Sequence, residues 1–247
     1  MSAELRKLVG LRAMWVAVGA ALLPAPAIAL LNVAGALAAI RDGRNDGSDA
    51  GFYELAFGAV SAVILGVTAM SSEYTSGGED SAASRQIVTT LTSVPSRWRL
   101  LAGKAGALVV VVSVVALVTA ALTLTVTRIG LGAHAAPLGA LAPRVAGVVV
   151  YWVLMALLAF AIATLTRSGV VPLAVLIVNS SVVSIGQLLT KVTPVATYLP
   201  DTAGARMFIH HVGSPVDIAP LTGGLVMAAW VLALLAVAAV AFHRRDA

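Results

Sequence analysis

The residues that could do chemistry in this 247-residue chain are few. His210 and His211 are adjacent, so on a helix they would point to different faces, and no carboxylate stands at metal-ligand spacing from them. We expect this pair to be solvated in a loop and to bind no metal. No P-loop, His-Glu-x-x-His or Gly-x-Ser-x-Gly sequence occurs, and cysteine is absent. The chain is therefore expected to be no enzyme and to hold no cofactor of its own.

A second polar group is a stripe of amide and hydroxyl side chains within an apolar run. Ser180, Ser184 and Gln187 follow i, i+4, i+7 spacing, and Asn179 stands beside them, so the four share a helical face. Polar side chains are costly in lipid, so this face should meet a protein interior or an aqueous path. Lining a substrate path and hydrogen bonding between helices both remain open interpretations.

The third polar group is an insert between two apolar runs, residues 73–104. Within it, Ile87, Leu91 and Val94 recur at helical spacing, which predicts a short amphipathic helix over residues 81–94. A simple connector could be far shorter than this. The insert is therefore interpreted as a docking surface for a soluble partner.

The end of the insert has a simpler explanation. Pro95 should stop the amphipathic helix and start the next one. Beyond it, Arg97, Arg99 and Lys104 flank Trp98, a combination that is typical of anchoring at a membrane interface.

The elements that must position these groups are membrane helices. Hydrophobic residues make up 60% of the chain and charged residues only 11%, which excludes an ordinary soluble domain. Six stretches are long enough, or nearly so, to cross a bilayer as helices: residues 13–40, 55–70, 105–126, 145–165, 170–189 and 221–242. Pro24 and Pro26 should kink the first, and Gly58 and Ser61 could allow close helix packing by the second. We therefore expect an all-α polytopic membrane protein with a single transmembrane domain over residues 1–247.

Charge predicts the orientation of these spans. Of the 16 Lys and Arg residues, ten fall on the side of both termini and six on the other, which favours cytoplasmic termini. The net charge of +5 is thus explained by basic residues that set the orientation of the spans beside an anionic leaflet. No nucleic-acid partner is expected. The spans lack a central ionisable residue, which disfavours ion-coupled transport.

Two flanking segments leave alternatives. Residues 1–12 could form an amphipathic helix in the headgroup plane or a plain basic flank. A cleaved signal peptide would end near Ala29, but apolar sequence continues to Ile40, which favours an uncleaved span. The loop at 190–220 is expected to be extracellular and to hold a short helical hairpin.

The order of several short motifs resembles the permease subunits of ABC type-2 exporters, especially actinobacterial ones. Ser72-Glu73-Tyr74, then a Thr-Thr-Leu helix at residues 86–91, then Pro95-Ser96-Arg97 and Lys104, is similar to the cytoplasmic loop of that family. Tyr198 to Gly204 resembles its Leu-Pro-x-x-Ala-Gly element. The resemblance covers the whole chain, although residues 78–85 look like an insertion.

This resemblance implies a function. It implies that residues 1–12 form an elbow helix and that the loop at residues 73–104 carries a coupling helix. This coupling helix would dock on a separate ATPase subunit, which binds ATP and Mg²⁺. A second permease copy or paralogue would complete the unit in the bacterial plasma membrane, and spans two and five would line the path. The expected coupling residues are Glu73, Arg85, Ile87, Thr90, Leu91, Pro95, Arg97 and Arg99. The expected path residues are Asn179, Ser180, Ser184 and Gln187. A membrane scaffold or sensor that recruits a soluble partner through the same loop is the alternative.

Overall fold

The computed structural model describes residues 12–44, 46–71, 97–170, 172–174, 185–211 and 216–244. Within these ranges all regular structure is helical and no strand is present. The long helices are α2 (Arg12–Leu22), α3 (Pro24–Arg41), α4 (Phe52–Ser71), α6 (Arg97–Leu131), α7 (Leu138–Thr166) and α11 (Pro220–Arg244). The short ones are η1 (Gly132–His134), α9 (Ile185–Thr190), η2 (Pro194–Tyr198) and α10 (Pro200–Ala205).

Five helical segments are long and apolar enough to cross a membrane. They are Val18–Arg41, Phe52–Met70, Leu101–His134, Leu138–Thr166 and Pro220–Arg244. The chain thus has the helices of an α-helical polytopic membrane protein, as its composition predicts. Most of the expected span at 170–189 lies outside the described residues, as does the expected elbow helix apart from Arg12.

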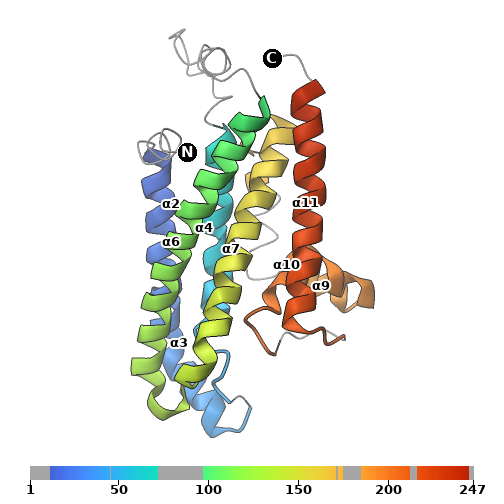
Figure 1. Ribbon diagram of the computed structural model, residues 1–247. Coiled ribbons are helices and arrows are strands. Elements are labelled where there is room, and N and C mark those ends of the chain that lie inside the picture. Colours follow the sequence, from blue (N-terminus) through green and yellow to red (C-terminus); the bar gives the residue numbers. More distant parts are fainter. Residues whose placement is uncertain are drawn as a thin grey trace.

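The helices run alternately up and down and place their ends at two levels (Figure 1). At one level α2 and α6 begin and α4, α7 and α11 end; we call this the terminal end. At the opposite level lie the α3–α4 connection and the α6–α7 turn, and the short helices α9 and α10 lie above them, beside the lower half of α11; we call this half of the bundle the loop end. The helix that starts at Arg12 is interrupted at Leu23, directly before Pro24, where the sequence predicts a kink.

The closest helix pair at the centre of the core is α4 and α7. Gly66 lies so near α7 that a Cβ atom there would stand 2.1 Å from the carbonyl oxygen of Ala156. About two turns earlier in α4, Gly58 leaves room for the ring of Trp152, whose Nε1 donates to the carbonyl oxygen of Leu55 at 3.0 Å. Small residues let two backbones approach in lipid, where dispersion contacts and interhelical hydrogen bonds hold helices together.

Helix α6 is longer than the apolar stretch that predicts it. Its 35 residues span about 52 Å, whereas a hydrocarbon core is about 30 Å thick. The sequence marks only residues 105–126, because hydropathy detects the apolar part of a helix and misses the turns that continue past it. Arg97 and Arg99 thus belong to the first turn of α6.

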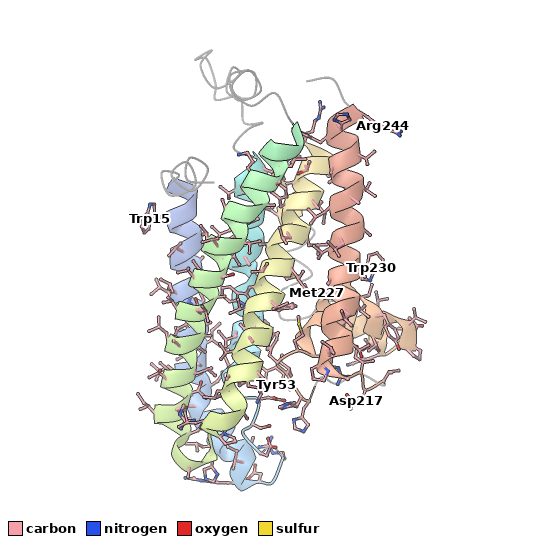
Figure 2. The ribbon with its side chains drawn as sticks, viewed as in Figure 1. Trp15, Tyr53, Asp217, Met227, Trp230 and Arg244 are labelled. Atoms are coloured by element: carbon pink, nitrogen blue, oxygen red, sulfur yellow. The ribbon has the colours of Figure 1, made fainter. Side chains whose placement is uncertain are left out.

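The described residues between α9 and α11, 191–211 and 216–219, form a group beside α11 (Figure 2). The indole of Trp230 donates to the carbonyl oxygen of Tyr198 at 3.0 Å. Gly223 lets α11 approach α10, since a Cβ there would stand 2.2 Å from the carbonyl oxygen of Ala203. Two short helices, η2 and α10, thus lie within residues 190–220, which the sequence treats as a loop with a helical hairpin.

Candidate functional site

Most of the sequence-predicted site residues fall outside the described part of the chain. This holds for Glu73, Arg85, Ile87, Thr90, Leu91 and Pro95 of the coupling set and for Asn179, Ser180 and Ser184 of the path set. Gln187 lies in α9 at the loop end, and Arg97 and Arg99 lie at the start of α6 at the terminal end. These assignments therefore stay predictions.

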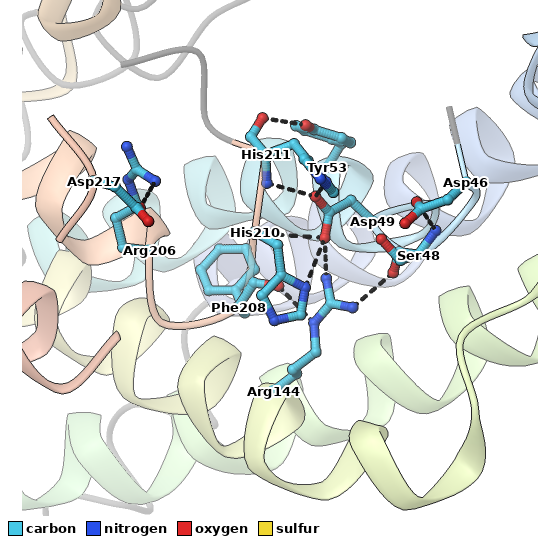
Figure 3. A network of polar contacts seen from close by, with 10 residues as sticks. All are labelled: Asp46, Ser48, Asp49, Tyr53, Arg144, Arg206, Phe208, His210, His211 and Asp217. Carbon is cyan, nitrogen blue, oxygen red and sulfur yellow. Dashed lines mark hydrogen bonds and ion pairs between the residues drawn. The ribbon is translucent and has the colours of Figure 1, made fainter. Parts of the chain in front are cut away.

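The structure instead brings together a polar group that the sequence does not indicate, shown in Figure 3. Asp49 lies in the α3–α4 connection, Arg144 in the second turn of α7, and His210 and His211 follow α10. We call these four residues the Asp49 cluster. The Asp49 carboxylate is paired with Arg144 and accepts the backbone N–H groups of His210 at 3.1 Å and His211 at 2.8 Å.

The guanidinium of Arg144 makes hydrogen bonds and a ring contact in addition to its ion pair with Asp49. Its Nε donates to the carbonyl oxygen of Phe208 at 2.8 Å, and its Nη1 donates to that of Ser48 at 2.6 Å. The guanidinium also lies over the ring of Phe52, 3.7 Å from its centroid. The side chains of Arg144 and Asp49 are only 5% and 2% exposed, so this is a buried ion pair whose charges are compensated by hydrogen bonds.

The expectation of a simply solvated histidine pair is corrected here. The imidazoles of His210 and His211 are indeed exposed, at 54% and 69%, but the peptide N–H groups of both residues bind Asp49. His211 Nδ1 also lies 3.1 Å from an Asp49 oxygen. Sequence spacing misses this carboxylate because folding brings it from 162 residues away.

The Asp49 cluster joins three separate segments at the loop end. Tyr53 adds a further tie by donating its hydroxyl to the carbonyl oxygen of His211 at 2.7 Å. Beside it, Arg206, directly after α10, pairs with Asp217 at 2.8 Å. These contacts connect the α3–α4 connection, the start of α7 and the residues that follow α10.

A polar cavity of about 520 Å³ opens next to this cluster. Its lining is Gly43, Arg44, Asp46, Asp49, Tyr53 and His211. Among the residues that the structure describes, no group of three or more His, Asp or Glu side chains is arranged to hold a metal ion. The cavity therefore offers a mixed-charge surface to water at the loop end.

A second buried carboxylate, Glu54, lies in the first turn of α4. It accepts the N–H of Gly51 at 2.9 Å, three residues earlier, as in a capping box, and the side-chain amide of Asn32 on α3 at 2.9 Å. Both oxygens are thus satisfied by N–H donors, and the charge stands at a helix N-terminus, where the helix dipole favours it. This interaction ties α3 to α4 and needs no ligand to explain it.

Acid should weaken the Asp49 cluster. Burial of Asp49 raises its pKa, but the N–H groups of His211 and His210 and the charge of Arg144 lower it by more, so the pKa lies below the ordinary value of 3.8. A carboxyl with a depressed folded-state pKa stabilises the fold above its unfolded pKa, and this contribution is lost as pH falls through the folded pKa. We expect the melting temperature of the purified protein to change little between pH 7 and 5 from this source and to fall below about pH 4.

The control for this prediction is Asp49→Asn, which keeps the shape of the side chain and removes its titration. The variant should be less stable at neutral pH and should lose less stability than the wild type below pH 4. Equal acid sensitivity in the two proteins would show that other carboxyls cause the loss.

Comparison of the chain with models of protein families, with curated proteins and with solved structures gives no match. The geometry and the residues themselves therefore carry the functional argument.

Proposed function

We propose that this chain is the membrane-spanning permease subunit of an ATP-driven ABC exporter. In this proposal it crosses the bacterial plasma membrane six times with both termini in the cytoplasm, and residues 1–12 form the elbow helix. A separate ATPase subunit binds ATP and Mg²⁺ and docks on the coupling loop at 73–104. A second permease, identical or paralogous, completes the unit, and the stripe Asn179, Ser180, Ser184 and Gln187 faces the substrate path.

The observation that supports this proposal most is how the two stems of the coupling loop are joined. Helix α4 ends and α6 begins at the terminal end, where α2 begins and α11 ends (Figure 1). The ammonium of Lys104, which is buried in α6, lies 3.4 Å from the carbonyl oxygen of Ala69 in the last turn of α4. A force on the loop between these helices would therefore act on both of them.

Helices α4 and α6 also contact each other at the loop end. Helix α4 starts just after Asp49, and α6 runs about 52 Å without a break to Leu131. Gly51, at a φ of +86°, lies so close to α6 that a Cβ there would stand 2.8 Å from Thr127 Oγ1. Two helices that touch at both ends could carry a movement of the coupling loop across the bundle, as alternating access would require.

The proposal is tested by the substitution Leu91→Asp in the full-length chain. Leu91 is assigned to the apolar face that the ATPase buries, and an unpaired charge in a buried interface costs roughly 2 kcal/mol or more. We expect the ATPase that co-purifies with the tagged chain to bind the variant at least tenfold more weakly and to lose its stimulation by the permease. The measurement is ATP hydrolysis by the reconstituted complex.

Thr89→Asp is the matched control, because it adds the same charge on another face of the predicted helix. This variant should keep most of the coupling, and the thermal stability of both variants should equal that of the wild type. If the two substitutions act equally, or if no ATPase co-purifies with the wild-type chain, the proposal fails. A scaffold or sensor would retain a soluble partner without ATP hydrolysis.

A further inference from the structure

The polar cavity at the loop end lies between two segments that are distant in the chain. Its lining, Gly43, Arg44, Asp46, Asp49, Tyr53 and His211, comes from the α3–α4 connection, the start of α4 and the residues after α10. We call it the loop-end cavity. Among the charged lining residues, Asp49 is 2% exposed and is compensated by Arg144. The charges that the cavity presents to a ligand are therefore those of Arg44 and Asp46.

These two charges have opposite signs and do not satisfy each other. The structure describes both residues and shows no ion pair between them. Arg44 pairs instead with Asp42, outside the lining, at 2.7 Å. Asp46 accepts the backbone N–H of Ser48 at 2.9 Å. The cavity thus has one cationic and one anionic group on its wall.

Arg44 keeps donors for an anion. A guanidinium carries five N–H donors, and the contact with Asp42 comes from Nη2 alone. The side chains of Arg44 and Asp42 are 68% and 57% exposed, and so exposed a pair is weak because water screens it. A carboxylate or phosphate in the cavity can therefore bind this guanidinium through two parallel hydrogen bonds.

Asp46 and His211 offer acceptors for an ammonium group. A carboxylate has about four lone-pair sites, so Asp46 can accept donors in addition to the N–H of Ser48. His211 Nδ1 lies 3.1 Å from an oxygen of Asp49, and both residues are drawn in Figure 3. Because a carboxylate only accepts, the hydrogen of this contact is on Nδ1, and Nε2 of the neutral ring is an acceptor. Tyr53 adds aromatic surface, which attracts an ammonium.

The residues next to the cavity that the structure does not describe leave this charge balance unchanged. They are Asn45 and residues 212–215, Val-Gly-Ser-Pro, and none of them has an ionisable side chain. A ligand with a single charge is attracted by one of the two charged groups and repelled by the other. A ligand with both charges is attracted by both groups.

We propose that the loop-end cavity binds a small zwitterion that carries one ammonium and one carboxylate or phosphate. Asp46 and His211 hold the ammonium beside Tyr53, and Arg44 holds the anionic group. The site goes beyond the proposed function and is independent of it, because binding requires neither the ATPase nor transport.

The test is calorimetric titration of the purified full-length chain with glycine, β-alanine, γ-aminobutyrate and phosphoethanolamine. These probes differ in the distance between their two charges and in the anionic group. At least one should bind about tenfold more tightly than both of its one-charge analogues, the amine and the acid of the same length. If none of the four binds, or if each binds no better than its analogues, the proposal is wrong.

Variants assign the two charges of the ligand to the wall of the cavity. Asp46→Asn should weaken binding of the best zwitterion about tenfold and remove its advantage over the acid analogue. Arg44→Gln should remove its advantage over the amine analogue. A purely structural role of either residue would weaken all ligands alike and leave these preferences unchanged.

Asp42→Asn is the matched control, because it makes the same chemical change outside the lining. It should bind the zwitterion at least as tightly as the wild type, since it removes the competing partner of Arg44. All three side chains are exposed, so the melting temperatures of the ligand-free variants should equal that of the wild type. Equal weakening by Asp42→Asn and Asp46→Asn, or an unchanged preference in Arg44→Gln, would overturn the site.

Discussion

Replacing Arg144 by Met should lower the free energy of unfolding by about 3–5 kcal/mol, because it leaves the buried Asp49 carboxylate without its cation. The substitution also removes the donors that hold the carbonyl oxygens of Ser48 and Phe208. The α3–α4 connection, the start of α7 and the segment after α10 should then separate at lower temperature. Thermal unfolding in detergent, followed by tryptophan fluorescence, measures the loss.

Arg44→Met is the matched control for this prediction. Arg44 pairs with Asp42 at 2.7 Å in the same connection, but the side chains are 68% and 57% exposed. An exposed pair contributes about 0–1 kcal/mol, so this variant should behave almost as the wild type. The double variant Arg144→Met/Asp49→Leu should recover part of the stability, since it removes the uncompensated charge as well. Equal losses for the two arginines would contradict the buried-pair assignment.

Gly66→Ala should cost about 3 kcal/mol, at the upper end of the range for overpacking. A Cβ at this position would stand 2.1 Å from the carbonyl oxygen and 2.9 Å from the carbonyl carbon of Ala156. Both atoms belong to the backbone of α7, so no side-chain rotation can relieve the clash and α4 must move away from α7. The expected result is a lower melting temperature of the purified protein.

The control uses the same substitution at a glycine with free space. A Cβ at Gly35 in α3 meets no atom within 4 Å, so Gly35→Ala should be neutral or stabilising by up to about 1 kcal/mol. The same chemical change is thus expected to destabilise the protein at Gly66 and not at Gly35. A similar loss at both positions would show that the α4–α7 contact does not explain the result.

Asp49 and Glu54 show why the polar residues at the loop end are hard to assign from sequence. The two carboxylates are five residues apart, yet Asp49 forms an ion pair with Arg144 and Glu54 accepts a hydrogen bond from Asn32. Sequence patterns report periodicity over neighbouring turns, whereas these partners lie 95 and 22 residues away. Only a weak signal was available, namely that a charged residue at the end of an apolar helix needs a partner.

The sequence by itself determined the class of the protein. With 60% hydrophobic residues and long apolar stretches, a chain in lipid must satisfy its backbone within helices, and the described residues are all-helical where they are regular. It also located the break before Pro24, because proline cannot donate the hydrogen bond that a continuous helix needs. Both outcomes depend on composition and on local backbone chemistry.

Only the tertiary structure decided which helices meet and what closes the loop end. The glycines of α4 could have faced any neighbour, and the contact between Gly66 and Ala156 fixes that neighbour as α7. The ion pair of Asp49 and Arg144, and the apolar groove between α6, α7 and α11, each require elements that are distant in the chain. Hydropathy is a local property of the sequence, whereas charge pairing and cavity shape depend on the packing of the whole bundle.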